Sequence, residues 1–159
     1  MSKKITLYLI VHNVSSPQRL VDVARIVFNK CSPFNYLIVS KPTGMAAQVG
    51  LPDVSRMSYK LNRNLIITSS IKDALDLIDA KQVYLINFSD VSELIYPEDI
   101  ELSDKTAIVV SGSDTGFTKS ELALGKPIHI APFTQSLGAV AEVTLLTYGL
   151  AKKLKICQG

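Results

Sequence analysis

Two glycine-containing turns follow short apolar runs in the last third of the chain, and together they suggest a ligand pocket. The run Ala107–Val110 stops before Gly112 and Gly116, and the run Ile128–Ala131 is followed by Thr134–Gly138. A glycine just after a buried strand lets the backbone approach a ligand closely, because it has no Cβ. In open α/β sheets, ligands bind at the carboxyl ends of the strands. We therefore expect one pocket made mostly of main chain.

Residues 45–64 are the least regular part of the chain and contain its most basic local stretch. Arg56, Lys60 and Arg63 lie close to Tyr59 in the sequence there. Such residues suit nucleic acid, because cations neutralise phosphates and a tyrosine ring can stack on a base. An ordinary solvated helix face is the alternative interpretation of the same pattern.

The histidines and cysteines carry weaker signals. His12 stands at the carboxyl end of an expected strand and could approach a substrate, whereas His129 alternates within a strand, which favours a packed position. Cys31 and Cys157 are far apart in the sequence, so we expect two inert thiols rather than a disulfide. The sequence has no cluster with metal-ligand spacing, no phosphate-binding loop and no nucleophile elbow, so we expect no metal.

Apolar runs of strand length alternate with helical patterns along the whole chain. The expected strands are Ile5–Val11, Tyr36–Val39, Leu65–Thr68, Gln82–Phe88, Thr106–Val110 and Pro127–Ala131. The expected helices are residues 17–29, Pro52–Leu61, Ile71–Asp79, Val91–Tyr96 and Ser136–Lys155. Continuously apolar strands between helices predict an α/β fold with a parallel sheet of about six strands and helices on both faces.

Three short signals mark where helices begin. Ser16 followed by Pro17 predicts an N-cap and a first helical residue. Ser70 with Asp73 resembles a capping box in which aspartate replaces the usual glutamate. Asp53 is a possible cap for the helix that begins near Pro52.

Length and composition are those of one globular domain spanning residues 1–159. Hydrophobic residues make up 47% of the chain and charged residues 19%, so it can bury a core. No apolar run approaches the roughly 18–20 residues that would cross a membrane. The N-terminus lacks a signal-peptide cleavage pattern, so we expect a cytoplasmic protein. The net charge of +3 is compatible with RNA binding but does not argue for it.

Three segments resemble motifs of the SPOUT superfamily, specifically of its SpoU/TrmH-like RNA 2′-O-methyltransferases. Pro17–Arg25 is similar to that family's Pro-x-Asn-x-Gly-x-x-x-Arg segment. Gly112–Phe117 resembles its Gly-x-Glu-x-x-Gly-Leu motif, and Ile130–Gly138 resembles its Ile-Pro…Ser-Leu-Asn motif. The three occur in the family's order and cover nearly the whole chain. The resemblance implies a trefoil knot within roughly residues 82–150 and a homodimer that pairs through the knot region.

The resemblance also implies an enzyme that binds S-adenosylmethionine and methylates a ribose 2′-hydroxyl of tRNA or rRNA. The positions that match cofactor contacts are Ile86, Asn87, Gly112, Ile130, Ser136 and Leu137. Arg25 matches the family's catalytic arginine, which would help to deprotonate the hydroxyl or orient the RNA phosphate. Candidate substrate-binding residues are His12, Arg19 and Asp114.

Several positions depart from the family pattern. Arg19 replaces the asparagine of the first motif, Asp114 replaces the glutamate of the second, and Gly138 replaces the asparagine of the third. Glu142, one helical turn later, could substitute for that asparagine, but it offers a charge in place of an amide. These departures favour an alternative, a catalytically degenerate knotted protein that binds RNA. A third hypothesis is an unrelated doubly wound protein without a knot.

Overall fold

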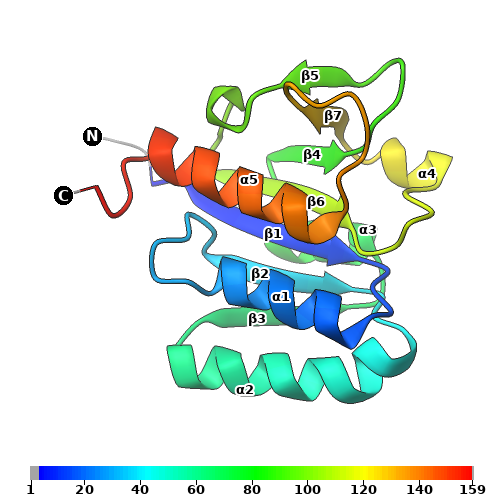
Figure 1. The fold of residues 1–159 in the computed structure, drawn as a ribbon, viewed down its shortest axis with the longest axis vertical. Coiled ribbons are helices and arrows are strands. Elements are labelled where there is room, and N and C mark those ends of the chain that lie inside the picture. Colours follow the sequence, from blue (N-terminus) through cyan, green and yellow to red (C-terminus); the bar gives the residue numbers. More distant parts are fainter. Residues whose placement is uncertain (1–3, 159) are drawn as a thin grey trace.

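The computed structural model describes residues 4–158, which form a single seven-stranded sheet with helices on both faces (Figure 1). The strands are β1 (Thr6–His12), β2 (Tyr36–Ser40), β3 (Asn64–Thr68), β4 (Gln82–Ile86), β5 (Glu93–Ile95), β6 (Lys105–Ser111) and β7 (Lys126–Ile130). Their order is β3-β2-β1-β6-β4-β7-β5, and every neighbouring pair is parallel. The predicted parallel α/β sheet is therefore confirmed, with one more strand than expected.

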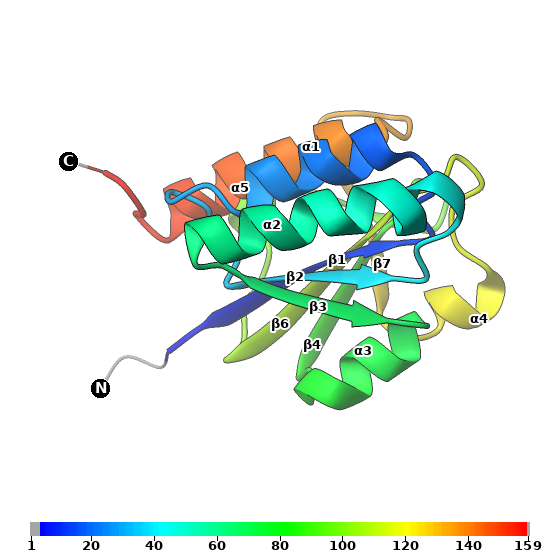
Figure 2. The same cartoon turned by 90° about the horizontal axis from the view of Figure 1, so that it is seen from below.

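The helices divide between the two faces of the sheet. Figure 2 shows α1 (Pro17–Val27), α2 (Leu51–Leu61) and α5 (Ala139–Lys153) together on one face, with α3 (Ile71–Ile78) on the other. A short α4 (Lys119–Leu122) packs through Leu122 with the core cluster on the α3 side. Two single turns, a π-helix at Ala46–Gly50 and a 3₁₀-helix at Pro97–Asp99, complete the helical elements of residues 4–158.

The central strands are buried on both sides, which explains their continuous apolar sequence. β1 and β6 lie in the middle of the sheet and pair along seven residues, from Thr6–Lys105 to His12–Ser111. One apolar cluster lies beneath α1, α2 and α5, and a second lies beneath α3 and α4. Because both strands run in the same direction, their carboxyl ends meet at one edge of the sheet.

The helix starts follow the predicted signals in part. The Ser16 side chain caps α1 by accepting a hydrogen bond from the backbone N–H of Arg19. In the same way, the Ser70 side chain caps α3 by accepting a hydrogen bond from the backbone N–H of Asp73. The Asp73 carboxylate accepts a hydrogen bond from the Ser69 hydroxyl. The prediction that Asp53 caps α2 is wrong, because α2 continues directly from the preceding π-helix and Asp53 lies inside its first turn.

Two local predictions are corrected by the tertiary structure. Residues 91–96 were expected to be helical, but Glu93–Ile95 form the edge strand β5 beside β7. Six residues are too few for a helical period to be reliable, and the open edge of β7 supplies backbone partners instead. α5 begins at Ala139, three residues later than expected, because Gly138 has a φ of +86° that ends the preceding loop.

Cys31 and Cys157 form a disulfide, so the prediction of two inert thiols is wrong. Their Cα atoms are 5.6 Å apart although 126 positions separate them in the sequence. Cys31 follows α1 and Cys157 follows α5, and these two helices pack side by side on the same face of the sheet. The bridge therefore fastens the C-terminal segment to the loop after α1.

The trefoil knot stays a prediction. β4, β6 and β7 are adjacent in the sheet, so the segments that would form the knot are neighbours in space.

We predict that the disulfide contributes substantially to stability. Closing a loop of more than a hundred residues restricts the unfolded chain, and the chain-entropy model puts this effect near ~4–5 kcal/mol. The Cys31→Ser/Cys157→Ser double variant should lose about 2–5 kcal/mol of unfolding free energy in urea titrations. Reduced wild-type protein is the matched control and should unfold at the same urea concentration as the variant. Equal stability of oxidised and reduced protein would contradict the prediction.

Candidate functional site

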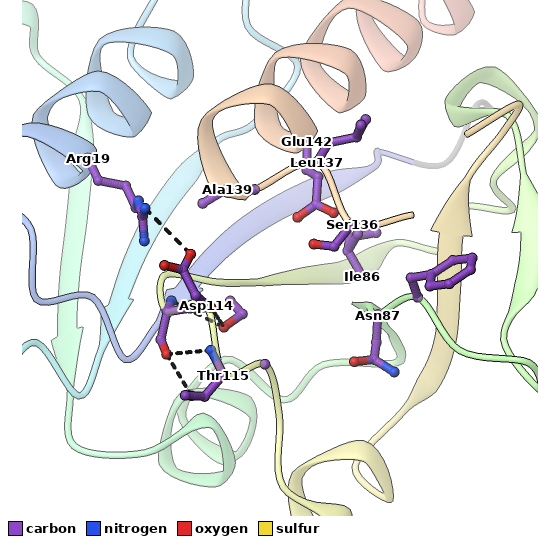
Figure 3. A pocket seen from close by; sticks show the side chains of 14 residues that line it. Arg19, Ile86, Asn87, Asp114, Thr115, Ser136, Leu137, Ala139 and Glu142 are labelled. Carbon is purple, nitrogen blue, oxygen red and sulfur yellow. Dashed lines mark hydrogen bonds and ion pairs between the residues drawn. The ribbon is translucent and has the colours of Figure 1, made fainter. Parts of the chain in front are cut away.

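Three chain segments at the carboxyl ends of β4, β6 and β7 enclose a cavity, and two of them are the glycine-containing turns that the sequence singled out (Figure 3). They are residues 86–88, 111–116 and 136–139, and they surround a cavity of about 620 Å³. Small-molecule sites in proteins commonly have volumes of roughly 300–1,000 Å³. The first turns of α1 and α5 close the remaining side of this cavity through Arg19 and Glu142.

Four of the six expected cofactor-binding residues line this cavity. Ile86 and Leu137 offer apolar surface, while Asn87 and Ser136 offer an amide and a hydroxyl. Gly116 and Gly138 also line it, with φ values of +73° and +86° that side chains rarely adopt. At these two glycines no side chain covers the backbone, and the expectation of a pocket made mostly of main chain stays a prediction.

Gly112 and Ile130 support the cavity without lining it. A Cβ on Gly112 would lie 2.6 Å from the Cβ of Val14, so only glycine allows this close packing. The backbone N–H of Gly112 donates to the carbonyl of His12 at 2.6 Å. Ile130 is buried in the core at the end of β7. Both residues fix the positions of strand ends, which is a structural role that the motif match does not distinguish from ligand contact.

Arg19 and Asp114 meet at the rim of the cavity. The Arg19 guanidinium donates to the carbonyl of Gly112 at 2.7 Å and lies 3.7 Å from the Asp114 carboxylate. The Asp114 side chain is 92% exposed, so the ion pair is largely solvated. Arg19 thus joins α1 to the glycine loop, and its charge lines the cavity.

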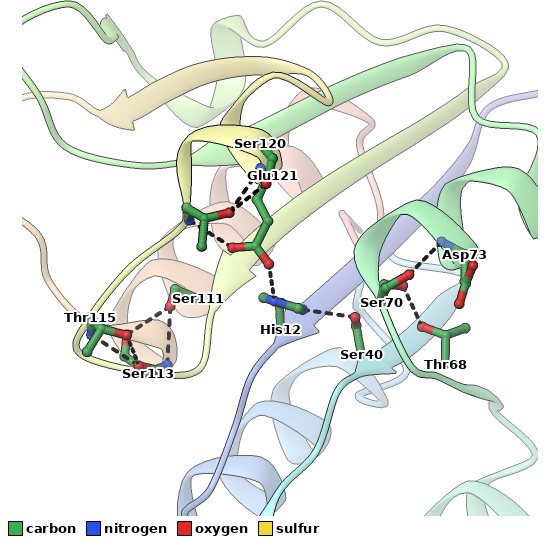
Figure 4. Close-up of polar contacts among 11 residues, drawn as sticks. His12, Ser40, Thr68, Ser70, Asp73, Ser111, Ser113, Thr115, Ser120 and Glu121 are labelled. Carbon is green, nitrogen blue, oxygen red and sulfur yellow. Dashed lines mark hydrogen bonds and ion pairs between the residues drawn. The ribbon is translucent and has the colours of Figure 1, made fainter.

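His12 is 3% exposed and does not line the cavity. Its Nδ1 lies 2.9 Å from the Ser40 hydroxyl, and its Nε2 lies 2.6 Å from the Glu121 carboxylate (Figure 4). Burial lowers the pKa of His12, Glu121 partly opposes this shift, and Lys41 adds to it. A neutral ring donates from Nε2 to Glu121 and accepts from Ser40. His12 therefore holds α4 against the end of β1, where substrate cannot reach it without a rearrangement.

Arg25 lies apart from the cavity. It is six residues beyond Arg19 on α1, which corresponds to about 9 Å along the helix axis. Its guanidinium is largely exposed, donates to Asp22 at 3.2 Å, and lines a separate groove of about 410 Å³ between α1 and α5. Within one copy of the chain, the structure does not bring Arg25 together with the expected cofactor-binding residues.

Glu142 lines the cavity. From its sequence position, it was expected only to substitute for the asparagine that Gly138 replaces. It is 8% exposed and lies one turn into α5. Burial raises its pKa to about 7, and a hydrogen bond from the backbone of Leu137 only partly opposes that shift. The sequence did contain a signal for a buried carboxyl, because Glu142 stands in an otherwise apolar turn of the helix. Val143 and Leu146 beside it are core residues.

The basic stretch lies elsewhere on the molecule. Arg56 pairs with Asp53 on α2, and the Arg63 guanidinium donates to the backbone carbonyl of Asn29 at 3.1 Å. Tyr59 is almost fully exposed on the same helix. None of these residues is among those that line the cavity. Both earlier interpretations, nucleic-acid contact and a solvated helix face, fit this placement.

Neither a metal-binding cluster nor a membrane-spanning helix is present among residues 4–158. No three histidine, cysteine, aspartate or glutamate side chains in this range are placed to hold a metal ion. No helix in the described part of the chain is long and apolar enough to cross a membrane.

The architecture is that of SpoU/TrmH-type SPOUT methyltransferases. A "probable methylase family protein" from Haemophilus influenzae matches with a TM-score of 0.71 at 18% identity, over 98% of this chain and 67% of that one. The SpoU methyltransferase AviRb from Streptomyces viridochromogenes, solved with AdoMet, matches with a TM-score of 0.73 at 15% identity, over 98% of this chain and 60% of that one. At such identities the likeness establishes the fold.

Sequence comparison gives the family. Residues 44–149 match the model described as RecB-family nuclease (DUF2122). A protein of Aeropyrum pernix named "Putative type II restriction enzyme ApeKORF2002P" is 32% identical over 144 residues, which is 90% of this chain and 91% of that protein. The chain therefore belongs to the family described as RecB-family nuclease (DUF2122), and this member has a SPOUT fold.

We predict that Arg19 stabilises the glycine loop mainly through the carbonyl of Gly112. Arg19→Ala should lower the unfolding free energy by ~1–2 kcal/mol, because it leaves that partly buried carbonyl without its charged donor. Asp114→Asn removes only a solvated ion pair and should change it by less than ~0.5 kcal/mol. Urea titration of both variants measures the difference. An Asp114→Asn loss as large as that of Arg19→Ala would contradict this account.

We also predict that Glu142 destabilises the folded chain at alkaline pH. The unfolded carboxyl releases its proton near pH 4.5, whereas the folded one holds it to about pH 7. The folded state is therefore penalised progressively between these values, and above pH 7 the penalty reaches ~3 kcal/mol. Glu142→Gln should exceed wild type in unfolding free energy by up to that amount at pH 8 and match it near pH 4.5. Glu101 is exposed, so the control variant Glu101→Gln should have the same unfolding free energy as wild type at each pH. A difference in unfolding free energy between Glu142→Gln and wild type that does not change with pH would contradict the prediction.

Proposed function

We propose that the protein is a cytoplasmic S-adenosylmethionine-dependent methyltransferase that acts on the ribose 2′-hydroxyl of a tRNA or rRNA nucleotide. The observation that carries this proposal is the cavity of main-chain loops at the ends of β4, β6 and β7, in a fold shared with SpoU/TrmH-type methyltransferases. The motif resemblance supports it independently, because Ile86, Asn87, Ser136 and Leu137 come together from distant parts of the chain.

The residues present fit the adenosyl cofactor. The volume of about 620 Å³ suits a nucleoside-sized ligand, and Ile86 with Leu137 offers apolar contact for a purine ring. Gly116 and Gly138 leave main-chain groups open to hydrogen bonding, while Asn87 and Ser136 could bind the ribose or the polar edge of the base. The cofactor would supply an electrophilic methyl group.

The charged residues at the rim suit RNA. Arg19 can hold a phosphate beside the cavity through paired hydrogen bonds, and its anchor on the Gly112 carbonyl limits its movement. Positioning the acceptor hydroxyl in this way lowers the entropic barrier to transfer. Asp114 competes for Arg19 in the free protein and would be displaced as a phosphate arrives.

We further propose a homodimer that pairs through α1 and α5. The groove between these helices exposes Tyr148, and beside it the Thr147 hydroxyl is buried without a hydrogen-bond partner among residues 4–158. Arg25 lines the same groove. In a dimer, Arg25 would serve a site that includes the other subunit, which reconciles its motif match with its distance from the cavity of its own chain.

The names of the sequence relatives favour a second candidate function, cleavage of nucleic acid. The cavity contains two carboxylates, Asp114 and Glu142, and one guanidinium, Arg19, and the rest of its wall is formed by glycines and by apolar and neutral polar residues. That composition supports nucleoside binding more directly than it supports phosphodiester cleavage.

One experiment separates methyl transfer, RNA binding alone and cleavage. Purified protein is incubated with methyl-tritiated S-adenosylmethionine and total RNA from cells that lack the protein, and in parallel with Mg²⁺ and duplex DNA or RNA. We expect label in RNA, in dinucleotides that resist alkaline hydrolysis. Ser136→Trp should abolish labelling by filling the cavity, whereas Gln135→Trp on the neighbouring exposed residue should retain it. RNA binding without labelling would support the degenerate alternative, and cleavage without labelling would overturn the proposal in favour of a nuclease.

A further inference from the structure

Glu142 is a buried acid that faces the cavity and has no basic partner. From the first turns of α5 its carboxylate points into the cavity, toward Ser136 (Figure 3). Within residues 4–158 Glu142 forms no ion pair, and its carboxylate accepts a hydrogen bond from the backbone of Leu137. A buried carboxylate without a cation is unfavourable, so the fold alone gives no reason for glutamate at this position.

The other charged groups that line the cavity do not neutralise it. Arg19 from α1 is held by the Gly112 carbonyl and by Asp114, and Asp114 from the loop after β6 is itself acidic. Titratable groups with strongly shifted pKa values concentrate at functional sites, and a base works best when its pKa lies near the working pH. The pKa of Glu142, about 7, meets that condition.

We propose that Glu142 is the general base of methyl transfer and accepts the proton that the RNA hydroxyl loses. This inference rests on the methyltransferase function proposed above. Glu142 receives a proton and becomes neutral, and the acceptor oxygen exchanges its O–H bond for an O–C bond. The donor sulfur keeps the electron pair of the broken S–C bond and changes from a sulfonium to a thioether.

This assignment changes the part that arginine plays. A guanidinium with a pKa above about 12 is a poor proton acceptor near neutral pH. Arg19, and Arg25 in a dimer, are then positioning residues that hold the RNA phosphate. The glutamate also accounts for the glycine at position 138, because a carboxylate one turn later reaches the cavity from the same helix.

The test compares wild type with Glu142→Gln, which keeps the shape of the side chain but cannot accept the proton. Binding of S-adenosylhomocysteine is measured by calorimetry, and transfer of tritiated methyl to total RNA from cells that lack the protein is measured between pH 5 and 9. The carboxyl titration is followed separately by carbon NMR of protein labelled on glutamate. Glu101→Gln on the exposed surface is the matched control.

We expect Glu142→Gln to bind S-adenosylhomocysteine within about twofold of wild type and to lose about 100-fold or more of the transfer rate. Wild-type transfer should rise with pH and level off above pH 7, and one carboxyl signal that titrates near pH 7 should be absent from Glu142→Gln. Transfer by Glu142→Gln within threefold of wild type would overturn the inference while leaving the methyltransferase function intact. Loss of S-adenosylhomocysteine binding only in Glu142→Gln would also overturn it, by making Glu142 a cofactor contact. A wild type that neither binds S-adenosylhomocysteine nor transfers methyl would overturn both proposals.

Discussion

The close packing of Gly112 against Val14 is the constraint on which the site depends. It brings the carboxyl end of β6 against the loop after β1, where only glycine fits because there is no room for a Cβ. In that position the Gly112 carbonyl lies within reach of Arg19 on α1, and the chain that follows turns through Ser113–Gly116 to form one wall of the cavity. The cavity is thus an outcome of how two central parallel strands end together.

The buried carboxyl of Glu142 in the first turns of α5 has opposite effects on stability and on proton transfer. Val143 and Leu146 pack into the core, as the amphipathic pattern requires, but Glu142 carries a carboxyl into the same buried region. Burial raises the pKa of Glu142 and so weakens the folded state above neutral pH, while it makes the same group competent to accept a proton. The disulfide between Cys31 and Cys157 joins the ends of α1 and α5, the two helices that carry Arg19 and Glu142, and so offsets part of that loss.

Local signals predicted most of the fold because they act within a few residues. Ser16 with Pro17 began α1, and continuous apolar runs located every central strand of the parallel sheet. The errors arose where distant segments decide the structure. Residues 93–95 form a strand because β7 offers an open edge. Cys31 forms a disulfide with Cys157 because α1 and α5 pack together. Neither contact leaves a periodic pattern in the sequence.

For the candidate site, too, the sequence indicated the location better than the contacts between distant segments. The glycine turns pointed to the carboxyl ends of the strands, and a cavity lies there that Ile86, Asn87, Ser136 and Leu137 help to line. His12 was expected to approach substrate, but the hydrogen bonds with Ser40 and Glu121 turn it toward α4, and sequence spacing could not reveal those partners. Arg25 matches a family motif as well, but it lies in the groove between α1 and α5, apart from the cavity of its own chain, and a motif match carries no information about that distance.

The central claim is that the main-chain pocket at the ends of β4, β6 and β7 binds the adenosyl cofactor. Titration of nitrogen-15-labelled protein with S-adenosylhomocysteine, followed by amide NMR shifts, tests it most directly because it reports where the ligand lies. We predict saturable shifts concentrated in residues 86–88, 113–116 and 136–139. Shifts confined to α2 or to the α1–α5 groove, or no shifts at millimolar ligand, would contradict the claim.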